Sequence, residues 1–133
     1  MNKDIQGQMK ELFGNSCCAY CYIYLRLKTD NVKKLTGELF NAWELGYVED
    51  DGFVSKPVQL LYSLGVTIRD IQNVPIDSIK DIKKATVVEY KLSKDAKASH
   101  FVVVENGNVI FDPSGDSNTV KNGIPVSYRK FIY

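Results

Sequence analysis

The hydrophobic period of the chain changes near residue 65, and this change constrains the fold more than any other feature. Before it, apolar residues recur at helical spacing in segments that end at glycines. After it, short runs rich in Val, Ile, Tyr and Phe are typical of β-strands. Helices followed by strands indicate an α+β fold, with N-terminal helices packed against a C-terminal antiparallel sheet. We expect one domain over residues 1–133, because no linker, repeat or low-complexity tract interrupts the pattern.

The expected elements follow from periodicity and from capping residues. Ser16 and Asp30 are the expected N-caps of the second and third helices, and Gly46 and Gly65 are expected to end the third and fourth. The predicted helices span residues 5–13, 17–27, 32–45 and 57–64. The predicted strands span residues 66–71, 86–92, 100–105, 109–111 and 126–132.

Charge and composition exclude several classes of protein. The net charge is +1, with Lys and Arg spread along the chain, so we expect neither a nucleic-acid partner nor binding to an anionic membrane surface. No segment reaches the ~20 apolar residues of a membrane helix, and the first residues do not resemble a signal peptide. The three cysteines all lie between Cys17 and Cys21, which argues against a disulfide framework. A reducing, cytoplasmic setting is therefore expected.

Cys17 is the candidate nucleophile, because it lies where the second helix is expected to begin. Backbone N–H groups and the helix dipole at such a position stabilise a thiolate. The same N–H groups can receive the oxyanion formed when an acyl carbon is attacked. Three cysteines in an aromatic helix can also be simple packing residues, and that interpretation stays open at this point.

His100 is the only histidine, and it precedes an apolar run that ends in the hairpin signal Asn106-Gly107. The returning strand leads to Asp112, followed by Pro113. A carboxylate beside an imidazole fixes its tautomer and stabilises its charged form, as a nucleophile–base pair requires. The alternatives are that His100 is a packed residue and that Asp-Pro merely opens a turn.

The register of this hairpin tests the pair. A two-residue turn would place Phe101 opposite Asp112 and send the two site residues to opposite faces. A three-residue loop over residues 105–107 would place Val104 opposite Asn108 and His100 opposite Asp112. We predict the three-residue loop, with Gly107 in the left-handed conformation.

Two segments resemble a known family. The run Ser16-Cys17-Cys18-Ala19-Tyr20-Cys21 is similar to the Ser-Cys-Trp-Ala-Phe-Ser sequence around the nucleophile of papain-like cysteine peptidases. The run from His100 to Val104, followed by Asp112-Pro113-Ser114-Gly115, resembles the compact bacterial branch that trims double-glycine leaders from bacteriocin precursors. The resemblance implies a papain-like fold with Cys17, His100 and Asp112 as a catalytic triad. Cys18 remains a rival nucleophile if the match is displaced by one residue.

One position departs from the family. The family usually has a glutamine six residues before the nucleophile, where its side chain donates to the oxyanion, and this chain has Glu11 there. Gln8 and Asn15 are the nearest possible substitutes. Losing one oxyanion donor costs about a hundredfold in rate, so a slow enzyme and an inactive one both fit.

The expected function is hydrolysis of a peptide or related amide bond through a thioester, with no cofactor and no metal. One alternative is a catalytically inactive binding protein on the same scaffold. Another is a metal site made by Cys17, Cys21 and His100. The sequence leaves the substrate and the oligomeric state open, and it places the groove walls in loops such as residues 48–55 and 93–99.

Overall fold

The structure of the protein is a computed structural model that describes residues 16–133. Three helices come first, and a five-stranded sheet with one short helix follows. The helices are α2 (Cys17–Leu27), α3 (Val32–Glu44), α4 (Pro57–Ser63) and α5 (Asn118–Asn122). The strands are β1 (Asp70–Pro75), β2 (Thr86–Lys91), β3 (His100–Glu105), β4 (Asn108–Phe111) and β5 (Ile124–Ile132).

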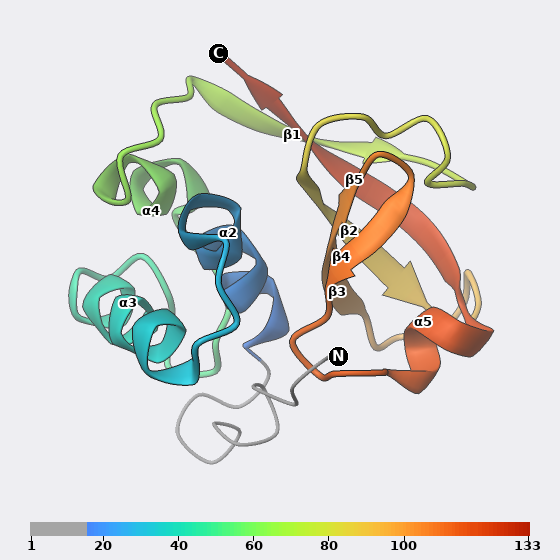
Figure 1. The fold of residues 1–133 in the computed structure, drawn as a ribbon, viewed down its shortest axis with the longest axis horizontal. Helices are drawn as coiled ribbons and strands as arrows, with labels where there is room; N and C mark the ends of the chain where they lie inside the picture. The colour runs from blue at the N-terminus through green and yellow to red at the C-terminus, as the bar shows by residue number, and fades with distance from the viewer. Residues whose placement is uncertain (1–15) are drawn as a thin grey trace.

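The sheet is antiparallel throughout, with the strand order β1-β5-β2-β3-β4. Helices α2, α3 and α4 gather beside one face of the sheet, and α5 lies near the opposite end of β5 from the C-terminus (Figure 1). This arrangement confirms the α+β class, with N-terminal helices and a C-terminal antiparallel sheet.

Helix α2 is the central helix of the fold. Its first two turns are buried almost all round, and Tyr20 and Ile23 have no exposed surface. The Tyr20 hydroxyl lies 3.1 Å from the Thr36 hydroxyl of α3, which joins the two helices. On the sheet side, Tyr24 stacks on Phe111 with ring centroids 4.2 Å apart. The helix that carries the candidate nucleophile is therefore fixed from both sides.

The sheet is covered on both faces, which explains the almost continuous apolar run in β3. Val103 belongs to the core shared with the helices, whereas Val102 and Val104 pack with Val88 on the other face. That second core is closed by the segment around Ile82. Since alternate residues of β3 serve two different cores, both sets are apolar.

The predicted helix bounds agree closely with the structure, whereas the first strand was misplaced. Strand β1 begins at Asp70 rather than at residue 66. It is a mostly exposed strand that, within residues 16–133, pairs only with β5, so its sequence carries little apolar alternation. Helix α5 was not predicted, because five residues carry too little periodicity. The predicted helix over residues 5–13 lies outside the described residues.

Two of the predicted caps behave differently from expectation. Helix α3 is capped by Asn31, whose side chain accepts a hydrogen bond from the Lys34 N–H, rather than by Asp30. Ser16 does occupy the N-cap position of α2, but its side chain makes no capping hydrogen bond. Gly46 and Gly65 have positive φ angles of 79° and 89° and end α3 and α4 as predicted.

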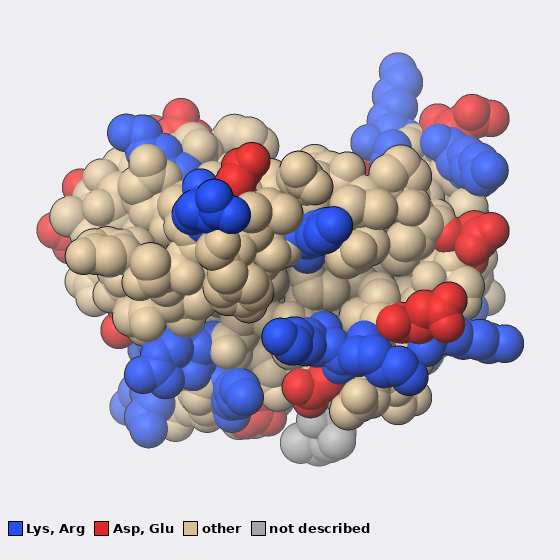
Figure 2. Space-filling view, turned by 90° about the horizontal axis from the view of Figure 1, so that it is seen from above, with Lys and Arg blue, Asp and Glu red and all other residues tan. Residues whose placement is uncertain are grey.

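The surface carries charges of both signs. Lys and Arg side chains are interspersed with Asp and Glu side chains over the face that Figure 2 displays. Among residues 16–133, no helix has the length and apolar character that crossing a bilayer requires.

The two glycines Gly123 and Gly37 provide a stability test. A Cβ atom at Gly123 would lie 2.2 Å from the Thr119 carbonyl oxygen and 2.3 Å from the Lys91 carbonyl oxygen. A Cβ atom at Gly37, within α3, would meet nothing within 4 Å. We therefore expect Gly123→Ala to lower the free energy of unfolding by about 1–3 kcal/mol. The control Gly37→Ala should raise it by about 0.5–1 kcal/mol.

Chemical denaturation of the two variants measures both changes. Equal stabilities for the two variants would contradict the close approach of β2 and α5 at Gly123.

Candidate active site

The three candidate residues come from two layers of the fold. Cys17 is the first residue of α2, in the helical layer. His100 opens β3, and Asp112 directly follows β4. All three are buried, with exposed fractions of 1%, 7% and 4%.

The hairpin that carries His100 and Asp112 differs from the prediction. Glu105 pairs with Asn108, so the turn has two residues rather than three. Asn106 and Gly107 have φ angles of 51° and 74°, and two positive φ angles match the twist of a two-residue hairpin. The predicted three-residue loop over residues 105–107 is therefore wrong.

A β-bulge in β4 places Asp112 on the same face of the sheet as His100, which the two-residue turn alone would not do. Val104 pairs with Val109, but Val103 pairs with Phe111, so Ile110 is the extra residue. Continued past Phe111, this register places Asp112 beside Val102, which shares a face of β3 with His100. The bulge thus brings the two site residues to one side of the sheet.

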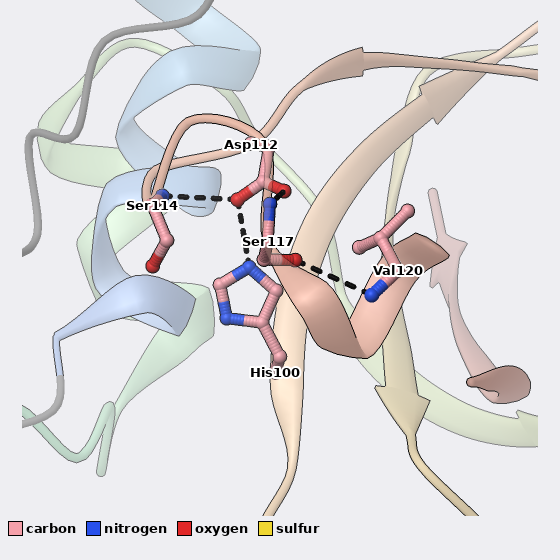
Figure 3. A network of polar contacts seen from close by, with 5 residues as sticks. All are labelled: His100, Asp112, Ser114, Ser117 and Val120. Carbon is pink, nitrogen blue, oxygen red and sulfur yellow. Dashed lines mark hydrogen bonds and ion pairs between the residues drawn. The ribbon is translucent and has the colours of Figure 1, made fainter. Parts of the chain in front are cut away.

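The His100–Asp112 contact is short and enclosed. Nε2 of His100 lies 2.7 Å from Oδ1 of Asp112. The same Oδ1 accepts a hydrogen bond from the Ser114 N–H, and Oδ2 accepts one from the Ser117 N–H. Ser117 in turn caps α5 by accepting from the Val120 N–H (Figure 3). The carboxylate is therefore fixed by two backbone N–H groups of the turn after β4 and by the imidazole of His100.

The other side of the imidazole faces Cys17. Hydrogen bonding and charge interaction with the Cys17 side chain both raise the pKa of His100, which puts the thiol within interaction range of the imidazole. Since Nε2 is engaged by Asp112, Nδ1 is the ring nitrogen available to the thiol, and Figure 3 draws it pointing away from the carboxylate. The order of contacts is thus thiol, imidazole, carboxylate, which is the order that a nucleophile, a base and an orienting group need.

The charges in this cluster support one another. Burial lowers the pKa of His100, but hydrogen bonds and charge interactions with Asp112 and Cys17 outweigh it and raise the pKa from 6.5 to about 9. Burial raises the pKa of Asp112, but His100 and the two backbone N–H donors outweigh it, and the net shift is downward from 3.8. At neutral pH the pair is an imidazolium beside a carboxylate, which presents a positive charge to the thiol.

The neighbouring cysteines are poor rivals. Burial raises the pKa of the Cys18 thiol to about 12, and negative charge on Cys17 adds to this rise. Burial also raises the pKa of Cys21, which has no exposed surface. A thiol held in its neutral form is a weak nucleophile, so the surroundings favour Cys17.

The N-terminus of α2 is placed to receive an oxyanion. The first hydrogen bond within the helix runs from the Tyr20 N–H to the Ser16 carbonyl, so the N–H groups of the preceding turn point out of the helix end. The Ser16 hydroxyl is buried at the same place and has no hydrogen-bond partner among residues 16–133. Gln8, Glu11 and Asn15, the positions expected to bear on the oxyanion, lie outside the described residues.

A groove of about 430 Å³ leads to Cys17 between the helical layer and the sheet. One wall is the loop before α4, which includes part of the predicted segment 48–55; residues 93–99 do not line it. The lining residues are Cys17, Cys18, Tyr22, Asp51, Gly52, Phe53, Val54, Pro57, Ile71, Asn73, Phe101 and Arg129. Most of these side chains are apolar, as expected of a site that binds an organic substrate.

The metal-site alternative finds no support in this arrangement. Within residues 16–133, no three or more His, Cys, Asp or Glu side chains are grouped so that they could hold a metal ion.

Several residues of the site were not found from the sequence. The Asp112-Pro113-Ser114-Gly115 turn was recognised, but not that Ser114 and Ser117 donate their N–H groups to Asp112. An aspartate whose side chain binds the backbone two residues later is a known turn habit and could have suggested the first of these bonds. Nothing in the sequence around Arg129 indicates a site residue. It lines the groove because the strand order places β5 between β1 and β2.

The single histidine makes the electrostatics directly measurable. Because its pKa is raised, protonated His100 stabilises the fold below pH 6.5, and this stabilisation is lost as the pH rises through about 9. The imidazole NMR signal should therefore titrate near pH 9. Asp112→Asn and Cys17→Ala should each move that midpoint down toward 6.5, because each removes a contact that favours the charged ring. An unchanged midpoint in both variants would contradict the arrangement of the three residues.

Comparison with known proteins places the chain in a family. The model of the family described as "Protein of unknown function, DUF261" matches residues 3–133, so the chain belongs to that family. No curated protein and no solved structure matched it.

Proposed function

We propose that this member of the DUF261 family is a papain-like cysteine hydrolase that cleaves a peptide or related amide bond. The observation that carries the proposal is the buried series of Cys17, His100 and Asp112, in which the central imidazole contacts both neighbours. A groove of substrate size that is lined in part by Cys17 supports it further.

The proposed reaction uses each side chain in turn. The Cys17 sulfur attacks the carbonyl carbon, and the negative charge that moves to oxygen is received by N–H groups at the start of α2. The His100 imidazolium donates its proton to the leaving amine as the carbon–nitrogen bond breaks, which leaves a thioester. Neutral His100 then accepts a proton from water, whose oxygen attacks the thioester and releases the acid and the Cys17 thiolate, with His100 again an imidazolium.

Asp112 acts through His100 rather than on the substrate. Its Oδ1 fixes the ring orientation and stabilises the charged form, and the backbone donors of Ser114 and Ser117 keep the carboxylate in place. No cofactor or metal takes part in these steps. Three free thiols suit the reducing cytoplasm that the sequence favours.

The second candidate is a binding protein on the same scaffold without turnover. It is favoured by Glu11, which occupies the position where a glutamine donor is expected and which, as a carboxylate, is a poor donor. The two candidates differ in whether Cys17 is merely reactive or also turns over a substrate.

Thiol labelling tests the activated cysteine. Iodoacetamide at pH 7 should modify Cys17 faster than Cys18 and Cys21, because only Cys17 contacts the imidazolium. His100→Ala should slow Cys17 labelling by about tenfold or more. Peptide mass spectrometry of the digested protein assigns each modified cysteine. Equal labelling of the three would contradict the hydrolase proposal.

Turnover requires a separate measurement. A pool of peptides incubated with the protein in H₂¹⁸O should gain new fragments that carry ¹⁸O at their C-termini, because water resolves the thioester. Cys17→Ala should abolish these fragments, and Asp112→Asn should reduce their rate of formation by a hundredfold or more. Cys18→Ala is the matched control and should retain activity. Selective labelling of Cys17 without any fragments would favour the binding protein.

A further inference from the structure

Among residues 16–133, Arg129 is the cationic residue that lines the groove, and its side chain is held by several contacts. Its guanidinium lies over the Phe101 ring, 5.3 Å from the ring centroid. Nη1 donates to the Ser127 hydroxyl at 3.0 Å. The guanidinium also interacts with the Tyr22 hydroxyl, whose pKa burial raises and Arg129 lowers. An arginine held by a ring and two hydroxyls has little rotamer freedom left to lose when it binds a ligand.

No carboxylate of residues 16–133 forms an ion pair with this guanidinium. Its hydrogen bonds lead to the Glu89 carboxylate through Ser127, whose hydroxyl accepts from Arg129 Nη1 and donates to Glu89 Oε1 at 2.9 Å. Glu89 also accepts a hydrogen bond from the Ser99 hydroxyl, so its carboxylate is already engaged. Asp51, on the helical side of the groove, is exposed and accepts from the Phe53 N–H.

A half-buried guanidinium with no ion-pair partner among residues 16–133, lying among mostly apolar groove residues, is suited to binding an anion. Arginine presents several N–H donors in a planar fork, and two of them together match a carboxylate. The surrounding apolar side chains strengthen such a contact, because they keep water away from it. Glu89 weakens the positive field only partly, since a hydroxyl separates the two groups.

We propose that Arg129 is a specificity-determining residue that binds a carboxylate of the substrate in the groove beside Cys17. This inference rests on the proposed hydrolase function, which it extends by naming the substrate class: peptides or amides that carry a carboxylate close to the bond attacked. An acidic side chain and a free C-terminal carboxylate offer the same chemistry to the guanidinium.

A pair of small alkylating reagents tests the charge without knowledge of the substrate. Iodoacetate carries a carboxylate where iodoacetamide carries a neutral amide, and we expect both reagents to alkylate Cys17. The ratio of their rate constants at Cys17 reports the positive field that a carboxylate meets there. His100 contributes to this ratio in every variant, so the comparison between variants isolates Arg129.

We expect Arg129→Gln to lower the iodoacetate-to-iodoacetamide ratio by about fivefold to tenfold, and Arg129→Lys to lower it less, because the charge remains. Lys130→Gln is the matched control: it removes the same charge from the next residue of β5, which is exposed and does not line the groove. A ratio that falls equally in Arg129→Gln and Lys130→Gln would overturn the inference, since it would reflect net charge alone.

A binding measurement on Cys17→Ala identifies the source of the carboxylate and does not depend on thiol reactivity. Three capped dipeptides are titrated into this variant and followed by NMR: acetyl-Ala-Glu-amide, acetyl-Ala-Ala with a free C-terminus, and neutral acetyl-Ala-Gln-amide. Either anionic peptide should bind at least fivefold more tightly than the neutral one and lose that advantage when Arg129→Gln is added. Equal binding of all three would overturn the inference. If iodoacetamide did not label Cys17 faster than Cys18 and Cys21 in the unsubstituted protein, the result would instead count against the proposed hydrolase function.

Discussion

The buried contact between His100 and Asp112 is the interaction on which the candidate site depends. It requires the two side chains to leave the β3–β4 hairpin on one face, and the two-residue turn at Asn106-Gly107 would by itself send them to opposite faces. The bulge at Ile110 supplies the one extra residue that corrects the register. The turn after β4 then offers two backbone N–H donors to the carboxylate. A local irregularity in one short strand therefore determines whether the imidazole has a partner.

The second requirement is that the helical layer delivers a thiol to that imidazole. Helix α2 does so because it is held between Thr36 of α3 and Phe111 of β4, through Tyr20 and Tyr24 respectively. Phe111 directly precedes Asp112, so the residue that anchors the helix on the sheet is the neighbour of the residue that orients the base. Packing and site geometry are thus coupled, and a change at Phe111 would disturb both.

The environment also separates three chemically identical thiols. Cys18 and Cys21 are held neutral by burial, whereas Cys17 contacts a ring whose pKa is raised to about 9. One helical turn therefore contains two packing residues and one candidate nucleophile. The groove beside Cys17 is also positively charged at one place, because Arg129 contributes a fixed positive charge to walls that are otherwise mostly apolar.

The sequence by itself determined the α+β class, the bounds of α2 and the identity of the three candidate residues. These features are local: periodicity, a helix start, a single histidine and an Asp-Pro turn are each readable within a few residues. It did not determine the hairpin register, because a turn dipeptide specifies the turn and not a bulge three residues later. It also misplaced β1, an edge strand whose exposed residues give little apolar alternation, and it did not find Arg129. Only the tertiary structure decided these, since Phe111 directly after the bulge stacks on Tyr24 of α2, a contact distant in sequence, and Arg129 reaches the groove because β5 lies between β1 and β2.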